Sequence, residues 1–417
     1  MHRRAVPSRR MSSDPTPAPT GPLAGIRVVD CSTVLAGPYC TMLLADLGAD
    51  VIKVEPPEGD ATRGWGPPWV GDAGAGTRTA AYFLAVNRNK RSLRLDLRTE
   101  AGREVLGRLL ARGDVLVENF RPGGFERLGF SEAALAALNP NLVHLAIGGY
   151  GIGGPDAAKP GYDFIIQATG GLMSITGEAA GRPAKVGVAI SDVVAGLFGT
   201  ISVLAGLLAK PRAGGQRVDV SLLGSTLAVL VNQAQNAFVT GRAPERRGNA
   251  HPNIVPYETF ETADGTIAIG VGSERQWPRF CAALGLPELA SDPRFASNGD
   301  RVVNRHELIP LVAARLATAG SAEWLSRLDA ADVPAGPLLD VLEAFATPQA
   351  QAVGAREPMT HPAFGAVDQV RSPFDFGATP ASIRTPPPLL GEHSAEILAE
   401  LGFAADEIER LRGIGVV

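Results

Sequence analysis

The segment between residues 26 and 54 limits most strongly what this chain can fold into. Residues 26–30 (IRVVD) form a short apolar run, residues 38–47 have the length and apolar character of a buried helix, and Gly48 precedes a second run at 51–54. A strand, a helix and a strand in this order form a βαβ unit, in which the two strands lie parallel in one sheet. The segment therefore predicts an α/β fold.

The alternation of strands and helices continues along the chain. We expect strands at 91–97, 115–117 and 142–147, and helices at 100–112 and 132–138. This order is typical of a doubly wound, Rossmann-like sheet, in which ligands bind at the carboxyl ends of the strands.

The pattern changes after about residue 225. Residues 257–262 and 266–269 are two β-rich runs separated by Asp264-Gly265, which predicts a hairpin, and helical segments follow it. We therefore expect a smaller α+β domain after the large one. The predicted organisation is a disordered tail at 1–20, the first part of the large domain at 21–225, a linker at 226–249, the small domain at 250–345, and a linker and C-terminal segment at 346–417.

Charges and cysteines exclude several kinds of partner. The chain has 417 residues and a net charge of −4, with basic residues spread along it, so nothing indicates nucleic acid. Cys31, Cys40 and Cys281 have no CxxC spacing and the histidines form no metal-binding motif, so we expect a reducing compartment and no metal. The stretch 193–209 is long and apolar, but it is the only one, so we expect a buried helix and no membrane association. The tail 1–20 has paired arginines with no apolar segment after them, so we expect a cytoplasmic protein.

Residues 149–154 (GYGIGG) match the dinucleotide-binding pattern GxGxxG and follow a predicted strand. That fingerprint also needs a helix that begins at the last glycine, because the helix amides must face the pyrophosphate. Here PDAAKP follows, which is typical of a loop, and the first turn after a strand, residues 31–37, lacks the glycines. A nicotinamide-dependent dehydrogenase is therefore not favoured.

Asp192 lies where residues 185–191, interpreted as a strand, run into the long apolar stretch. An aspartate at such a junction most simply caps the helix, because its carboxylate accepts hydrogen bonds from free amides and suits the helix dipole. The same place suits a carboxylate nucleophile. Local sequence favours the cap. A second carboxylate, Asp163, lies in a glycine-rich region and alone would be a turn residue.

Seven motifs taken together say more than each does alone. In chain order they are VLAGPYCTMLLADLGADVIKVEPPEGDATRGWGP, NRNKRSLRLDL, ENFRPGGFERLGF, GYGxxGP, GYDFIIQATGGLMSITG, VGVAISDVVAGLF and PPPLLGEH. They closely resemble the class III CoA-transferases, the family of formyl-CoA, carnitine and bile-acid CoA-transferases, from about residue 22 to the C-terminus. The resemblance implies a Rossmann-like large domain to which the segment 346–417 returns, a small domain, and an interlocked homodimer of threaded rings. It also implies acyl-CoA and small carboxylic acids as substrates and no permanently bound cofactor.

The same resemblance implies roles for individual residues. Asp192 matches the nucleophilic aspartate of the family, and Asp163 matches a second active-site acid. Some members carry an arginine after the second strand where this chain has Pro56, so we expect basic residues nearby to take over the nucleotide contacts. The expected CoA contacts are Leu35, Ala36, Leu95, Arg98, Asn119, Arg121, Arg127 and Tyr162, together with the replacements Arg63, Lys90 and Arg91.

A small-domain loop, RGNAHPN, stands where the formyl-CoA members carry a run of glycines. We expect its amides to face the oxyanion of each intermediate, with Gly248, Asn249 and His251 binding the substrate. The longer segment RRGNAHPNIVPYETF looks most like the succinyl-CoA–dicarboxylate branch, which includes glutarate-type acceptors. In that branch Arg246, Arg247 or His251 would hold a distal carboxylate.

The implied reaction is CoA transfer through a covalent intermediate. Asp192 attacks the thioester to form an aspartyl anhydride, the CoA thiolate returns to form an aspartyl-CoA thioester, and the acceptor acid attacks in turn. Racemases of 2-methylacyl-CoA esters are the alternative, but they carry Gly-His-Asp where this chain has Gly161-Tyr162-Asp163. Racemisation needs two opposed acid–base groups, of which one is missing here. A second alternative is a protein that binds acyl-CoA without catalysis. The intact motif around Asp192 argues against it, because binding alone would not need the nucleophile.

Overall fold

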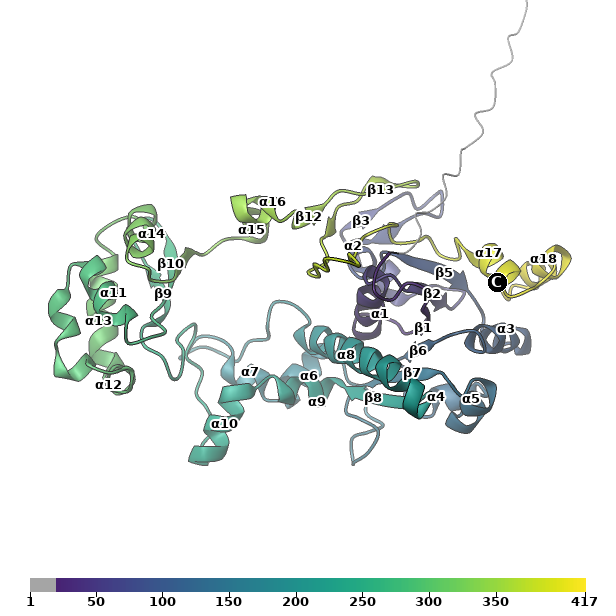
Figure 1. Cartoon of the computed structure of the whole chain (residues 1–417), viewed down its shortest axis with the longest axis horizontal. Helices are drawn as coiled ribbons and strands as arrows, with labels where there is room; N and C mark the ends of the chain where they lie inside the picture. The colour runs from purple at the N-terminus through teal and green to yellow at the C-terminus, as the bar shows by residue number, and fades with distance from the viewer. Residues whose placement is uncertain (1–19) are drawn as a thin grey trace, which may run out of the picture. The chain divides into compact units, whose positions relative to one another are not determined.

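The computed structural model describes residues 20–417, and these divide into two compact units (Figure 1). Unit 1 comprises the residues through Ile166, Ala189–Thr226 and Gly354–Val417, and unit 2 comprises Gln167–Val188 and Leu227–Val353. The C-terminal segment thus belongs to unit 1 from Gly354 onward. The segment 226–249, expected as a linker, contains helix α10 (Val231–Thr240) of unit 2. The expected tail at 1–20 lies, up to residue 19, outside the described residues.

Unit 1 is built on one parallel sheet. The sheet has six strands in the order β5-β2-β1-β6-β7-β8, so the chain changes direction across the sheet between β1 and β6. Ligands of open α/β sheets bind at such a switch point, outside the carboxyl ends of the strands. The parallel sheet itself confirms the predicted α/β class. The strands are β1 (Arg27–Cys31), β2 (Asp50–Glu55), β5 (Lys90–Arg94), β6 (Val115–Glu118), β7 (Val143–Gly148) and β8 (Arg217–Ser221).

Helices cover both faces of this sheet (Figure 1). Successive strand residues point to opposite faces, so Val28 and Val29 of β1 belong to two different cores. One core includes residues of α1 (Ala36–Asp46) and α8 (Ile190–Ala213). The helices over the other core are α3 (Glu100–Leu110), α5 (Glu132–Leu138), α17 (Ser394–Glu400) and α18 (Ala405–Gly413).

The predicted strand at 185–191 is wrong. Residues 185–189 are irregular, Val188 is 59% exposed, and α8 already begins at Ile190. The alternation of valines in this segment resembles a strand, but the place beside β7 is occupied by β8, which follows α8 in the chain. The sequence analysis did not identify β8, because its short RVDVS run has only two apolar residues, with Arg217, Asp219 and Ser221 at the alternate positions.

Helix α8 is only partly the buried helix that was expected. Its small residues, including Gly196, Gly199 and Gly206, are buried against the sheet and α1. On its other side Ile201 and Leu208 are 59% and 79% exposed. Among residues 20–417, α8 is the one helix long and apolar enough to cross a membrane, and a core helix has the same composition.

The C-terminal segment returns to the sheet through side chains of the NRNKRS motif. Asn89, at φ +60°, accepts hydrogen bonds from the Arg384 and Thr385 amides at 2.6 and 3.0 Å. Ser92 Oγ accepts a hydrogen bond from the Gly391 amide at 2.9 Å. The motifs NRNKRS and PPPLLGEH therefore meet in the structure and complete unit 1.

Unit 2 contains a three-stranded antiparallel sheet in the order β11-β10-β9. The predicted hairpin is confirmed as β9 (Tyr257–Glu261) and β10 (Thr266–Gly270), and β11 is Ala335–Pro337. The main helices of the unit are α11 (Gln276–Leu284), α12 (Asn298–Val303), α13 (Arg305–Leu316) and α14 (Ser321–Ala330). The short helices of the chain are α2 (Ala81–Leu84), α4 (Gly124–Arg127), α6 (Asp163–Thr169), α7 (Leu172–Ile175), α9 (Leu222–Ala228), α15 (Val341–Ala346) and α16 (Pro348–Ala352).

Candidate active site

Asp192 is the third residue of helix α8 and is half-buried. The N-cap position is taken by Ala189, so the interpretation of Asp192 as the helix cap is wrong. Burial, and next the negative charge of Asp163, raise the pKa of the Asp192 carboxyl to about 7. A carboxylate with this pKa is more basic, and hence more nucleophilic, than an ordinary aspartate in water.

Asp163 supplies the cap that α8 lacks locally. Its Oδ1 accepts a hydrogen bond from the backbone N–H of Ser191 at 2.8 Å. The Ser191 hydroxyl in turn accepts one from Thr226 Oγ1 at 2.9 Å, and both of these residues are buried. The start of α8 is thus fixed by side chains that are remote in sequence, and Asp163 lies beside the turn that carries Asp192.

Gly149, the first glycine of GYGIGG, serves chain packing. A Cβ built on Gly149 would lie 2.8 Å from the Cα of Gly161, so the two backbones are in direct contact. Residues 151–160 form a loop with no helix in it, as the sequence predicts. The contact returns the chain to the end of β7 and places Tyr162 and Asp163 there.

The start of α8 also lies against the start of α1. A Cβ on Gly196 would lie 2.7 Å from the carbonyl oxygen of Ala36, and Gly196 follows Asp192 by one helical turn on the same face. Asp192 therefore lies near Leu35 and Ala36, two of the expected CoA contacts.

Tyr82, on α2, is a further candidate site residue that the sequence analysis did not name. Burial raises the pKa of its phenol, and the negative charges of Asp192, Asp163 and Asp60 raise it further, so the phenol lies among these carboxylates. Its ring packs edge-on against Trp65 at 5.3 Å. The only signal in the sequence is its position just before the NRNKRS motif.

Two cavities lie at the carboxyl ends of the strands and share Phe120. The smaller, of about 320 Å³, lies outside the ends of β5, β2, β1 and β6. It gathers the expected contacts Leu95 and Arg98 around an apolar floor, with Pro56 on its wall. Its lining residues are Cys31, Thr33, Val54, Pro56, Glu58, Leu95, Asp96, Leu97, Arg98, Phe120 and Leu128.

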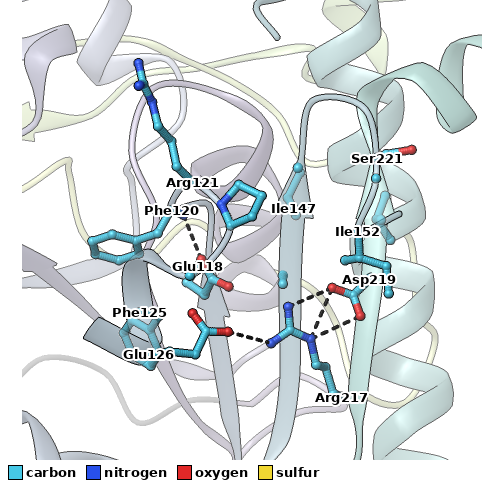
Figure 2. Close-up of a pocket in the computed structure, with 16 residues that line it drawn as sticks. Glu118, Phe120, Arg121, Phe125, Glu126, Ile147, Ile152, Arg217, Asp219 and Ser221 are labelled. Atoms are coloured by element: carbon cyan, nitrogen blue, oxygen red, sulfur yellow. Dashed lines mark hydrogen bonds and ion pairs between the residues drawn. The ribbon is translucent and has the colours of Figure 1, made fainter. Parts of the chain in front are cut away.

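The larger cavity, of about 450 Å³, lies outside β6, β7 and β8. Figure 2 shows Arg217 between two carboxylates of this cavity: it binds Asp219 at 2.9 Å and lies 3.8 Å from Glu126. The Arg121 side chain lines its rim and extends away from that pair (Figure 2). Arg217 is thus neutralised here, and in the smaller cavity Arg98 is likewise paired with Asp96 at 2.8 Å, so these ion pairs do not favour one cavity over the other for a phosphate. Asp192 lines neither cavity.

Residues 23–394 match the CoA-transferase family III. This chain belongs to that family. It is 44% identical over 382 residues to a succinate–glutarate CoA-transferase of Agrobacterium fabrum, covering 91% of this chain and 96% of the relative. It is 38% identical over 399 residues to the human succinyl-CoA:glutarate CoA-transferase, covering 95% and 90%. A crystal structure of a CaiB/BaiF family protein from Brucella suis is 43% identical, with a TM-score of 0.81 over 92% of this chain and 100% of the other. The protein is an enzyme that transfers CoA, as the sequence analysis predicts.

Three basic residues expected at the nucleotide of this CoA-transferase have protein partners instead. Arg63 pairs with Glu55 at 2.7 Å and donates to the Pro388 carbonyl. Lys90 is buried and donates to Asp30, Asn87 and the Pro38 carbonyl. Arg91, at the opposite end of β5 from the cavity, binds Asp50, Glu396 and Glu400. These positions favour a structural role, because each guanidinium or ammonium group already faces carboxylates.

Two further expected contacts, Asn119 and Arg127, are neighbours in sequence of Phe120 and Leu128, which line the smaller cavity. Asn119 accepts a hydrogen bond from the Thr33 amide and donates one to the Thr33 carbonyl, so its amide group holds the loop after β1. Arg127 is exposed at the end of α4, next to the cavity residue Leu128. Tyr162 is 65% exposed before α6.

The expected substrate loop of the CoA-transferase lies in unit 2. Gly248 has φ +59°, which favours glycine, and its amide donates to the Gly177 carbonyl. The Asn249 side chain donates to Thr259 Oγ1 at 3.0 Å, and His251 Nδ1 accepts from the Asn253 amide. Burial and the neighbouring Arg305 lower the pKa of His251, so the imidazole is neutral at pH 7. The loop is therefore an ordered one.

Proposed function

We propose that this enzyme moves CoA between succinyl-CoA and a dicarboxylic acid of the glutarate type, with Asp192 as the covalent nucleophile. The observation that carries the proposal is the pKa of Asp192, which burial and Asp163 raise to about 7, at the point where α8 meets the start of α1. The relatives at 44% and 38% identity are named for succinate and glutarate, which supports this pair of acids.

The ionised Asp192 carboxylate attacks the thioester carbon and expels the CoA thiolate, which leaves an aspartyl–succinyl anhydride. The thiolate then attacks the Asp192 carbonyl carbon, so succinate leaves with one former Asp192 oxygen. The acceptor carboxylate attacks the resulting aspartyl-CoA thioester, and the released thiolate attacks the acceptor's carbonyl, which restores Asp192. No step uses water, so the free energy of the thioester is conserved. The Gly248 amide already donates to the Gly177 carbonyl, so we assign the Asn249 amide to the developing oxyanions.

Asp163 has a positioning role in this proposal. It holds the first turn of α8 through Ser191 and raises the pKa of Asp192 by its charge. Both effects act on the nucleophile, and neither needs Asp163 to contact the substrate.

We propose that Arg247 binds the distal carboxylate of the dicarboxylic acid, and not Arg246 or His251. Arg246 donates to the Gly181 carbonyl at 2.7 Å, and His251 is held within its own loop. Arg247 pairs with the exposed Glu245 at 3.3 Å, a partner that a substrate carboxylate can replace. A dicarboxylate would gain an ion pair there that a monocarboxylate lacks.

We also propose that the protein is a cytoplasmic, interlocked homodimer, as the family resemblance implies. The exposed apolar side chains of α8 (Leu197, Ile201, Leu208) and α10 (Phe238, Val239) would be covered in such an assembly. The racemase alternative has no support in the relatives, which are CoA-transferases, and Tyr162 stands where the racemases carry histidine.

Oxygen labelling tests the proposal. Glutarate labelled with ¹⁸O in its carboxylates is incubated with unlabelled succinyl-CoA, and products are analysed by mass spectrometry. Each cycle leaves one acceptor oxygen on Asp192, so succinate released in the next cycle must carry ¹⁸O. Asp192→Asn should abolish exchange, whereas Asp156→Asn, at a partly exposed loop carboxylate paired with Lys159, should not. Exchange without ¹⁸O in succinate would rule out the aspartyl intermediate.

A further inference from the structure

Val34, in the loop between β1 and α1, has an unusual backbone conformation. Its φ is +71°, in the left-handed region that β-branched residues adopt least readily. Its backbone N–H points to the Asp60 carboxylate, with N–O distances of 3.3 and 3.4 Å. Surrounding groups must therefore hold this residue in place, and Asp60 is one of them.

Lys53 holds the same loop from its other end. Its ammonium group donates to the Ser32 carbonyl at 2.9 Å and pairs with Asp60 at 2.9 Å. The side chains of Lys53 and Asp60 are both fully buried. A buried ion pair is often no more stable than apolar residues of the same size, so its presence favours a role in selecting one conformation.

The loop that this ion pair holds leads directly into two expected CoA contacts. Leu35 is the N-cap of α1 and has no side-chain cap, and Ala36 is the first helical residue. Residue 34 sets the direction in which the following amides point, because its dihedral angles orient the next peptide. Asp192 lies near the same helix start, since α8 packs against Ala36.

We propose that Lys53 and Asp60 are positioning residues for acyl-CoA. By holding Val34 in its left-handed conformation they fix Leu35 and Ala36 where the CoA thioester binds, next to the nucleophile. The inference rests on the proposed function, because it uses Leu35 and Ala36 as CoA contacts. It assigns to two buried charges, which touch no substrate, a role in the affinity for CoA.

Rescue by glycine tests this role. Lys53→Met/Asp60→Ala removes both anchors without leaving a buried charge unpaired, and Val34→Gly is then added, because glycine adopts φ near +70° without help. Isothermal titration of the full chain with CoA should show about tenfold weaker binding for the double variant and recovery to within about threefold for the triple variant. If the double variant does not fold, Asp60→Asn with and without Val34→Gly gives the same comparison with a smaller change.

The matched control is the ion pair Asp46–Arg88, equally buried at the other end of α1. Asp46→Ala/Arg88→Met should lower the melting temperature and leave the Kd for CoA unchanged. Normal CoA binding by the anchor variant would overturn the proposal, and so would weak binding that Val34→Gly does not restore. Because titration needs no acceptor, a wild-type protein that binds CoA but exchanges none with glutarate would contradict only the proposed acid pair.

Discussion

The Asp163 carboxylate accepts a hydrogen bond of 2.8 Å from the backbone amide of Ser191, the residue that precedes Asp192. Burial raises the pKa of Asp192 most, and the acid that raises it further is therefore also the acid that caps its helix. These two effects can be separated, because asparagine at position 163 keeps an acceptor oxygen and loses the charge, whereas alanine loses both.

The rate of CoA transfer should rise with pH as Asp192 loses its proton, with a midpoint near its pKa of about 7. Asp163→Asn removes the neighbouring negative charge, so we expect the midpoint to move down by roughly one pH unit or less. The measurement is kcat/KM for succinyl-CoA as a function of pH. An unchanged midpoint in a folded Asp163→Asn protein would contradict the electrostatic role of Asp163.

Asp163→Ala should also destabilise the protein, because the Ser191 amide loses its acceptor. Loss of a helix cap costs about 1 kcal/mol in the free energy of unfolding. Urea denaturation should show this loss for Asp163→Ala and little of it for Asp163→Asn. Equal stability of the two variants would mean that the hydrogen bond to Ser191 contributes nothing measurable.

Asp192→Asn should make the protein more stable at alkaline pH. The pKa of Asp192 is about 7 in the folded state against an ordinary value of 3.8, so the fold favours the protonated form. The wild type therefore loses stability as pH rises from about 4 to about 7, and the asparagine variant lacks this loss. We expect its advantage to grow by about 1–2 kcal/mol between pH 5 and pH 8, allowing for partial exposure. Chemical denaturation at the two pH values measures it, and a constant difference would refute the raised pKa.

Arg98→Ala and Arg91→Ala should affect different properties: the first should weaken substrate binding, and the second should lower stability. Arg98 lines the smaller cavity, and its exposed guanidinium is paired with Asp96, a partner that a phosphate can replace. Its loss should therefore raise KM for succinyl-CoA about fivefold, as expected for one charge-assisted contact to a phosphate. Arg91 binds Asp50, Glu396 and Glu400, so its loss should lower the melting temperature and leave KM unchanged. If Arg91→Ala raised KM and Arg98→Ala did not, the nucleotide of CoA would not bind at the smaller cavity.

Much of the fold follows from local pattern. The helix expected at 132–138 has the same bounds in the structure as α5, because an amphipathic run begins after a capping serine, Ser131. The strand expected at 185–191 is wrong. An alternating run becomes a strand only if a neighbouring strand is free to pair with it, and the free edge of β7 is paired with β8. That competition is decided by tertiary packing, which periodicity does not encode.

Ordered motifs in the sequence are enough to name candidate site residues. They do not show in which direction a side chain points, or which partner it meets. The ordered motifs single out Asp192 as the candidate nucleophile, but they do not show that its helix is capped by Asp163, which lies twenty-eight residues before Ser191. Lys90 and Arg91 are basic residues beside a strand, as ligand-binding residues often are. One is buried on Asp30 and the other faces an acidic cluster, and a linear sequence does not show these partners.

The return of the C-terminal segment has a consequence for how the protein is made. Asn89 and Ser92 bind backbone groups of residues 382–391, which leave the ribosome after all of unit 2 has been synthesised. The first part of unit 1 therefore lacks these hydrogen-bond partners while nearly three hundred further residues are translated. Unit 2, whose second part is one continuous stretch, can fold during that interval, so the unit whose synthesis begins first is the one completed last.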